Sequence, residues 1–356
     1  MKIGIITYHR SYNYGATLQA IATRVFLAKN GYNVFYIDYF PDYHKSMYQL
    51  FDKVGFEHMG LYARIKYLKS FIKHYKEKKK RISVYDPYVK EYIEPFCLKT
   101  EMNIYDAVIY GSDQIWRKQT GLGNKFNPYY FGDNDIKCDI NISYAASMGN
   151  MNLSEKDKVF LHTTLSKFKC IGVREKSLFN LVHSLNLNNI SLTIDPTFLL
   201  EANEWDKILF TKRLINASYC FYYCVRSSFR DRDVNEFCRA KGLKLIRVNS
   251  FYHPKGSNYN PNPSEFVSLI KYADYVLTSS FHGLAFSVIY KKEVIVSLKS
   301  NSERLLTLMD NIGIVDHFLS PHVSIPTDLN KIDYDKVYGL LDDWKVKSKE
   351  FLLQSL

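Results

Sequence analysis

Apolar and polar residues alternate along the chain in blocks that predict strands followed by helices. Short apolar runs bounded by polar residues are typical of buried strands, whereas longer segments with apolar residues three and four positions apart are typical of helices. In the first half, the predicted strands are 2–8, 34–38, 107–110, 142–145, 170–173 and 191–194, and the predicted helices are 16–29, 154–168 and a segment from Glu175. This alternation predicts a parallel sheet with helices on both faces.

The same pattern starts again after Asp195 and Pro196. Here the predicted strands are 218–225, 243–248, 275–278 and 294–298, and the predicted helices are 234–240, 264–272, a segment from Phe281, and 334–353. A chain of 356 residues is long enough for two domains. We therefore predict an α/β fold with two Rossmann-like domains, 1–200 and 201–330, that face each other across a cleft, and a terminal helix within 331–356 able to pack back on the first domain.

Residues from about 41 to 100 interrupt the alternation and predict a helical, basic insertion in the first domain. Between 61 and 81, apolar residues recur at helical spacing and basic residues fill most other positions, which predicts a basic amphipathic helix. The apolar residues are Leu61, Ile65, Leu68, Ile72 and Tyr75, and the basic ones are Arg64, Lys66, Lys69, Lys73, Lys76, Lys78, Lys79, Lys80 and Arg81. Such a helix either packs by its apolar stripe and leaves an ordinary solvated face, or it attracts an anionic membrane surface or a polyanionic substrate.

Composition narrows the class of protein. A hydrophobic content of 46% with 24% charged residues is that of a folded globular protein. The sequence has no apolar run of membrane-spanning length and no basic leader, so we expect a cytoplasmic protein, peripheral at the inner membrane face if the basic helix binds lipid. The six cysteines form no C-x-x-C pair and no cluster with histidine, which predicts no metal site. The net charge of +12 would suit nucleic acid, but no nucleic-acid motif accompanies it, and we expect no such partner.

The segment 275–286 has the most distinctive local chemistry. It places Ser279, Ser280 and His282 where a buried strand ends and its crossover helix begins. Free N–H groups and the helix dipole make such a terminus an anion site, and a histidine in the first turn could move a proton beside the bound anion. The alternative interpretation is a helix cap with a histidine held by a backbone carbonyl.

Other predicted strand ends also carry polar side chains. Residues 9–16 follow the first strand, where Gly15 permits close backbone approach and Asn13 offers a donor and an acceptor. Residues 111–116 place a glycine, a hydroxyl, a carboxylate, an amide and an indole where a sugar could bind, although a helix cap explains Ser112 and Asp113 equally well. Arg174 follows another strand and either grips a carboxylate or phosphate or forms a plain salt bridge.

Six segments in this order resemble the polysaccharide pyruvyl transferase family. They are 7–9 with 13–20 (TYH and NYGATLQA), 111–116 (GSDQIW), 143–147 (SYAAS), 172–177 (GVREKS), 195–197 (DPT) and 280–283 (SFHG). The resemblance implies two Rossmann-like domains in a GT-B-like arrangement. It also implies transfer of the pyruvyl group of phosphoenolpyruvate to two hydroxyls of one sugar, forming a cyclic ketal and releasing phosphate, in surface or capsular polysaccharide synthesis. No metal or organic cofactor is implied.

The resemblance divides the candidate residues into three roles, with the acceptor expected on the first domain and the donor on the second. His282 is the expected catalytic residue. The expected donor-binding residues are Arg174, Ser279, Ser280, Phe281, Gly283 and Lys292, and the expected acceptor-binding residues are His9, Asn13, Tyr14, Gly15, Gly111, Ser112, Asp113, Gln114 and Trp116. Some relatives carry arginine two positions before the histidine, where this chain has Ser280. The loop then offers less positive charge to a phosphate, and Lys291, Lys292 or Arg304 could supply that charge instead.

Two other functions remain compatible with the sequence. A GT-B glycosyltransferase using a nucleotide sugar would share the fold and the cleft, but uridine nucleotides rather than phosphoenolpyruvate would protect it against thermal unfolding. A non-catalytic carbohydrate or polyanion binder would use the basic helix and would release no phosphate from phosphoenolpyruvate. The acceptor itself stays open between a lipid-linked saccharide, a nucleotide sugar and a finished polymer.

Overall fold

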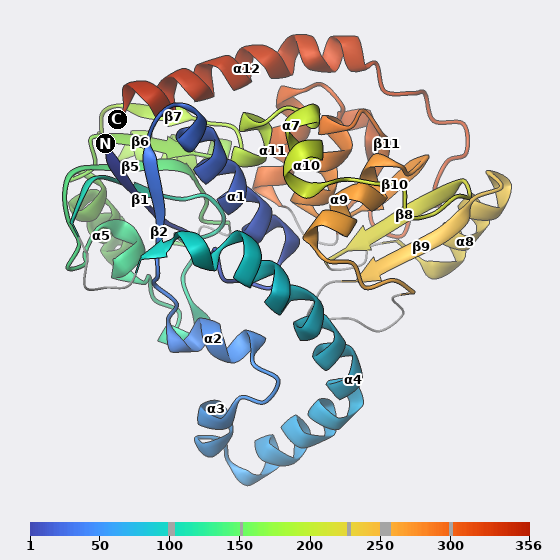
Figure 1. Cartoon of the computed structure of the whole chain (residues 1–356), viewed down its shortest axis with the longest axis horizontal. Helices are drawn as coiled ribbons and strands as arrows, with labels where there is room; N and C mark the ends of the chain where they lie inside the picture. Colours follow the sequence, from blue (N-terminus) through green and yellow to red (C-terminus); the bar gives the residue numbers. More distant parts are fainter. Residues whose placement is uncertain (99–103, 150–151, 226–228, 250–257, 299–301) are drawn as a thin grey trace.

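The computed structural model describes residues 1–98, 104–149, 152–225, 229–249, 258–298 and 302–356, and these form two parallel sheets with flanking helices (Figure 1). The predicted α/β class with two Rossmann-like units is therefore confirmed. The first sheet contains, in spatial order, β3 (Cys97–Leu98), β2 (Asn33–Ile37), β1 (Lys2–Ile6), β4 (Ile104–Tyr110), β5 (Lys137–Ala146), β6 (Cys170–Val173) and β7 (Ile190–Leu192). Every neighbouring pair is parallel, so the carboxyl ends of these strands meet at one edge of the sheet.

The second sheet has the same parallel construction. Its spatial order is β12 (Phe318–Leu319), β11 (Glu293–Ser297), β10 (Tyr275–Thr278), β8 (Tyr219–Cys224) and β9 (Lys244–Asn249). The interior strand β8, between β10 and β9, reads YCFYYC and is buried at every position, as expected for a strand covered on both faces. Both sheets thus form cores that hold their connecting loops in fixed places.

Helices cover both sheets (Figure 1). In the first domain they are α1 (Tyr14–Lys29), α5 (Glu155–Leu165) and α6 (Lys176–Ser184); in the second they are α7 (Ala202–Leu209), α8 (Asp231–Ala240), α9 (Pro263–Lys271), α10 (Phe281–Ile289) and α11 (Glu303–Asn311). Short 3₁₀ turns lie at Glu94–Phe96, Thr120–Leu122, Pro128–Phe131, Pro196–Leu199 and Val315–His317. The Asn13 side chain caps α1, and the Ser280 side chain caps α10. These two caps set where the loops after β1 and β10 end and the helices begin.

The domains are joined by contacts between the starts of α1 and α9 and by the last helix, α12 (Tyr334–Gln354). The Tyr14 ring stacks on Phe266 at 4.2 Å between centroids, and its hydroxyl donates to the Pro261 carbonyl at 2.9 Å. Helix α12 runs along both domains (Figure 1), and its Ser348 hydroxyl accepts from the Ile194 N–H at 3.0 Å. It therefore lies against the first domain.

The insertion forms α2 (Asp42–Tyr48), α3 (Lys53–Glu57) and α4 (Leu61–Tyr92), and the chain then returns to the first sheet as its edge strand β3. The sequence prediction missed β3, because two residues are too few to show a period. The last turns of α4 pack on the body through Arg81, Tyr85, Tyr88 and Val89, while its first half projects away with α3 (Figure 1). Within the described residues no helix has both the length and the apolar character needed to cross a bilayer.

The helix predicted over 61–81 forms as part of α4, but its leucines and isoleucines do not pack as the solvated-face interpretation required. Leu61 is 78% exposed and Ile72 74% exposed, whereas the rings of Tyr67 and Phe71 contact Phe51. The aromatic residues lie on a different side of the helix from the leucines and isoleucines, and α3 packs on the aromatic side. Periodicity alone could not tell which of the two apolar faces α3 would cover.

Candidate functional site

Loops from the carboxyl ends of both sheets meet at one place. The first domain contributes Ser112 and Asp113 after β4, Arg174 after β6, Asp195 after β7, and Gly15 at the start of α1. The second domain contributes His282 in the first turn of α10 and Arg304 in the first turn of α11. Strand ends of parallel sheets are where α/β proteins bind ligands, and the contacts below tie these residues into one cluster.

Arg174 and Asp195 form the buried centre of this cluster. Arg174 is 1% exposed and donates through Nη1 to Asp195 Oδ2, and to the Ser112 hydroxyl at 3.3 Å. Asp195 Oδ1 accepts from the backbone N–H of Thr197 at 3.0 Å and from its hydroxyl at 2.7 Å. Within the described part of the chain, Nε and Nη2 of Arg174 are buried without a hydrogen-bond partner. The salt bridge thus leaves part of the guanidinium fork available to a ligand.

His282 lies beside the same carboxylate. Its Nε2 is 3.6 Å from Asp195 Oδ2, and the two form an ion pair whenever the imidazole is protonated. Burial by itself raises the pKa of Asp195, but His282, Arg174 and the Thr197 N–H outweigh burial and hold that pKa well below its usual range. Asp195 is therefore an ionised orienting group and not a proton donor near neutral pH.

The imidazole of His282 packs directly against Gly15. A β-carbon built at Gly15 would lie 1.8 Å from Nδ1 of His282 and 2.3 Å from its Cε1. The ring therefore packs directly on the backbone of α1, which joins the two domains at the site. The predicted close approach at Gly15 is found here, against a side chain of the same protein.

Asp113 and Arg304 form a second pair across the domains. Nη1 of Arg304 is 3.3 Å from Asp113 Oδ1, which also accepts from the Gln114 N–H at 2.8 Å. Burial raises the pKa of Asp113, but Arg304, Arg174 and His282 lower it by more than burial raises it. The pKa of Asp113 therefore lies below its ordinary value. Burial and the neighbouring Arg174 charge lower the pKa of Arg304, and its Nε is buried without a partner among the described residues. Two guanidinium groups thus lie close together with unused N–H groups.

The start of α10 has the cap geometry expected from the sequence. Ser280 Oγ accepts from the Gly283 N–H at 3.4 Å, and the Ser279 hydroxyl accepts from the Val225 N–H at 3.0 Å. The Arg174 guanidinium lies 4.8 Å from the centroid of the Phe281 ring. Ser280 has the capping role that the alternative interpretation gave it, whereas Ser279 instead holds the chain after β8; the helix terminus and His282 still lie within the cluster.

Several expected acceptor residues are structural. Trp116 is fully buried, and its indole N–H donates to the Tyr130 carbonyl at 2.9 Å, so its ring is not an open platform for a sugar. Tyr14 joins the domains, and its hydroxyl accepts from Arg81 at 2.6 Å; burial raises the pKa of Tyr14 to about 12. The side-chain oxygen of Asn13 caps α1 by accepting from the Gly15 N–H. Gln114 is half-buried beside Gly149, and Gly111 packs against the Tyr144 carbonyl.

Lys292 lies at the wrong end of α10 for donor binding. The helix runs from Phe281 to Ile289, so about 10 Å of helical rise and three further residues separate Lys292 from His282. Burial lowers the pKa of Lys292, and the charge of Asp274 offsets only part of that shift. Lys291 lies over the Tyr338 ring of α12 at 4.6 Å. Three cations were expected to replace the missing positive charge at position 280, and Arg304 is the one of these three that lies within the cluster.

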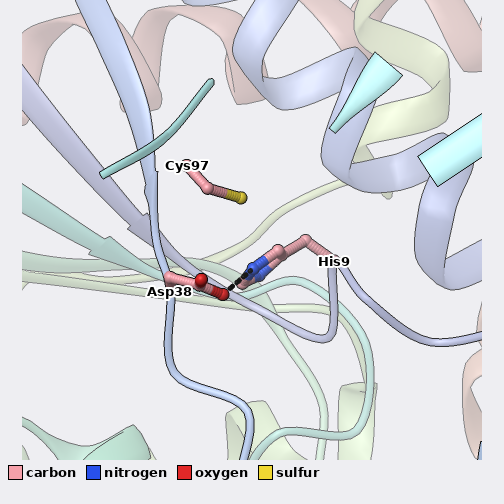
Figure 2. A group of neighbouring side chains, drawn as sticks. All are labelled: His9, Asp38 and Cys97. Carbon is pink, nitrogen blue, oxygen red and sulfur yellow. Dashed lines mark ion pairs between the residues drawn. The ribbon is translucent and has the colours of Figure 1, made fainter. Parts of the chain in front are cut away.

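His9 lies apart from this cluster, with Asp38 and Cys97 (Figure 2). The ligand atoms of the three residues are within 4.8 Å of one another, and His9 Nε2 is 3.6 Å from Asp38. Arg10, however, donates to both carboxylate oxygens of Asp38, at 2.5 and 2.8 Å. Burial raises the pKa of the Cys97 thiol to about 12. A guanidinium on the carboxylate and a protonated thiol both oppose a cation at this place.

Two functional candidates were underestimated from the sequence. Asp195 is part of a quoted motif but received no role, and Arg304 was one of three possible cations. The DPT segment directly after a predicted strand was a usable signal for Asp195. Nothing local distinguishes Arg304, since its place beside Asp113 depends on how the domains meet.

Residues 13–298 match the polysaccharide pyruvyl transferase family, which is most of the chain, and the protein belongs to that family. The family membership expected from the six segments is thereby confirmed. No curated protein sequence matches the chain significantly.

Solved structures resemble the chain weakly over its whole length. UDP-GlcNAc 2-epimerase from Methanocaldococcus jannaschii is 12% identical, with 99% of each chain covered and a TM-score of 0.48. The corresponding enzyme from Rickettsia bellii is 10% identical, with 99% of this chain and 95% of that chain covered and a TM-score of 0.45. The calicheamicin glycosyltransferase CalG4 is 12% identical, with 99% and 94% covered and a TM-score of 0.37. Similarity at this level carries no argument about the reaction.

Proposed function

We propose that this pyruvyltransferase uses phosphoenolpyruvate as donor and joins its pyruvyl group to two hydroxyls of one sugar as a cyclic ketal, releasing phosphate. The observation that carries the proposal is the meeting of Arg174, Arg304 and His282 at the start of α10, with unused guanidinium N–H groups. The expected setting is the synthesis of a surface or capsular polysaccharide, which agrees with the family.

The charges of the cluster support a donor with two anionic groups. A buried N–H group without a partner costs roughly 1–3 kcal/mol, and a carboxylate or phosphate that accepts from it removes that cost. Arg174 and Arg304 offer three such donor nitrogens in total, and each guanidinium already has one carboxylate partner. A donor with a carboxylate and a phosphate would lie between the two arginines and offset their mutual repulsion.

His282 is the group best placed to move protons. Asp113 and Asp195 have pKa values held low by their cationic neighbours, so both are weak bases. Histidine is the side chain that exchanges a proton near neutral pH. In the proposed reaction C3 of the donor gains a proton and becomes a methyl group, and two C–O bonds form at C2. The bond from C2 to the phosphate oxygen breaks, and the second hydroxyl proton leaves with the phosphate.

The acceptor is proposed to bind on the first-domain side of the cluster, near Asp113 and the half-buried Gln114. These side chains follow β4 at the same sheet edge as Arg174. An amide and an ionised carboxylate suit sugar hydroxyls, which both donate and accept hydrogen bonds. Ser112 contributes less directly, because it is fully buried beneath Arg174.

Phosphate release from phosphoenolpyruvate across a panel of glycosides tests the proposal. We expect release with at least one glycoside that has a suitably spaced pair of hydroxyls, and none with the matching glycoside in which one hydroxyl of the pair is methylated. Thermal unfolding gives a second test without an acceptor, since a donor at 100 times its Kd adds about 2.7 kcal/mol of stability. Protection by uridine nucleotides and not by phosphoenolpyruvate would favour the nucleotide-sugar glycosyltransferase instead.

A further inference from the structure

The projecting part of the insertion has an apolar face that no described residue covers. We define the arm as residues 51–80, which comprise α3 and residues 61–80 of α4 (Figure 1). Leu61, Ile65, Leu68 and Ile72 are spaced by four, three and four residues, so they form one row along α4. Their side chains are 78%, 46%, 39% and 74% exposed, and the neighbouring Tyr62 is 83% exposed. The row is about 17 Å long at 1.5 Å per residue.

The arm is held together without this row. The rings of Phe51, Phe56 and Tyr67 contact one another, and the Tyr67 hydroxyl accepts from the Asp52 N–H at 2.8 Å. Arg64 donates to the carbonyls of Phe56 and Glu57 at 3.1 and 2.7 Å. The exposed row is thus not the packing surface of the arm, and its residues are free to contact something else.

Lysines lie directly beside the apolar row. Lys69, Lys73, Lys76 and Lys80 are exposed and repeat the same spacing of four, three and four residues. At 100° per residue their row is turned by about 80° from the apolar row. The sequence has no Asp or Glu from 58 to 76. Lys78 differs, because it faces Asp52 and burial lowers its pKa. An apolar row with a cationic border is the pattern of a helix that lies in a membrane interface.

We infer that the arm docks the protein on an anionic lipid bilayer, with the apolar row among the acyl chains near the surface and the lysine row at the lipid phosphates. A second copy of this chain fits worse, because facing lysine rows repel and five side chains offer far less than the roughly 800 Å² per partner of a stable interface. A soluble polyanion would engage the lysines and leave the apolar row exposed. The inference does not depend on the donor or on the reaction, although it would bring a lipid-linked saccharide acceptor within reach.

Sedimentation of the full-length protein with vesicles tests the docking. We expect binding to vesicles of phosphatidylcholine with 30% phosphatidylglycerol, and little binding to phosphatidylcholine alone. Each lysine lost at an anionic surface should weaken binding roughly five-fold, so Lys69→Gln, Lys73→Gln and Lys76→Gln together should weaken it about a hundred-fold. The double change Ile65→Ser and Ile72→Ser should weaken it at least ten-fold at unchanged charge.

Matched controls lie elsewhere on the surface. Val159→Ser with Val346→Ser removes two exposed apolar side chains from α5 and α12, and Lys156→Gln with Lys207→Gln and Lys336→Gln removes three exposed charges. Both control variants should bind vesicles as the parent does. Unchanged phosphate release on a soluble glycoside in the arm variants would separate docking from catalysis, and vesicle binding keeps its meaning even if phosphoenolpyruvate proves not to be the donor.

A tryptophan on the row reports insertion directly. In Leu61→Trp the emission should shift to shorter wavelength on anionic vesicles and be quenched by brominated acyl chains. The inference is overturned if the serine variant binds vesicles as tightly as the parent, or if vesicles bind without quenching. Equal binding of parent and serine variant to dextran sulfate, with no vesicle binding by either, would make the arm a polyanion site instead.

Discussion

Replacing Gly15 with alanine should displace His282 without unfolding the protein. The added β-carbon would lie 1.8 Å from Nδ1, and an ordinary contact begins at 3.4 Å, so the ring must move by about 1.6 Å. A misplacement of about 1 Å can cost on the order of 10² in rate, which is about 2.7 kcal/mol of transition-state stabilisation. We therefore expect turnover in Gly15→Ala to fall about a hundred-fold.

The same change should have little effect on stability. Alanine is favoured over glycine inside a helix by up to about 1 kcal/mol, which offsets part of the cost of moving the ring. Gly339→Ala is the matched control, since it also lies in a helix and no described atom lies within 4 Å of the added carbon. Turnover should be measured as phosphate release at saturating donor, alongside the midpoint of thermal unfolding. Gly15→Ala with turnover within three-fold of Gly339→Ala would refute the placement of His282 at the reacting atoms.

Three further substitutions test the cluster. His282→Asn should fold normally and lower turnover by 10²- to 10⁴-fold in the phosphate-release assay, because asparagine keeps a hydrogen bond but cannot cycle a proton; parent-like turnover would remove His282 from the mechanism. Arg304→Gln should raise the KM for phosphoenolpyruvate at least ten-fold, with the exposed Arg239→Gln as control, and an unchanged KM would assign Arg304 a structural role. Asp195→Asn should lower the free energy of unfolding by about 3–5 kcal/mol in urea, because Arg174 is left buried and unpaired. Since the folded pKa of Asp195 is depressed, its stabilisation is complete above the unfolded value of about 3.9 and is lost as pH falls through the folded pKa. The parent should thus lose this stability only in acid below pH 4, and Asp195→Asn should lack that loss; equal acid sensitivity would contradict the ion pair.

The sequence predicted the alternation of strands and helices well because the buried strands are continuous apolar runs. It also placed polar residues correctly at the strand ends after β1, β4, β6 and β10, since those ends are fixed by local pattern. Edge strand β3 was missed because two residues cannot show a period.

The failures came where tertiary packing decides. Trp116 belongs to the same polar segment as Ser112, yet its indole is buried in the core, where its N–H donates to the Tyr130 carbonyl. Lys292 is near His282 in sequence, but a full helix lies between them. Arg304 meets Asp113 across 191 residues of chain, and no local pattern encodes such a pairing. Helix α4 has two apolar faces, one aromatic and one of leucine and isoleucine, and the position of α3 determines that the aromatic face is covered.

The most direct test of the central claim follows the donor carbon that becomes the ketal. The protein is incubated with phosphoenolpyruvate labelled with ¹³C at C2 and the glycoside that releases phosphate best, and the product is examined by ¹³C NMR. The account predicts loss of the vinyl signal and a single new ketal signal coupled to the protons of a methyl group, with one phosphate released per ketal. A product whose label is free pyruvate, or in which C2 is bonded to a single sugar oxygen, would contradict it.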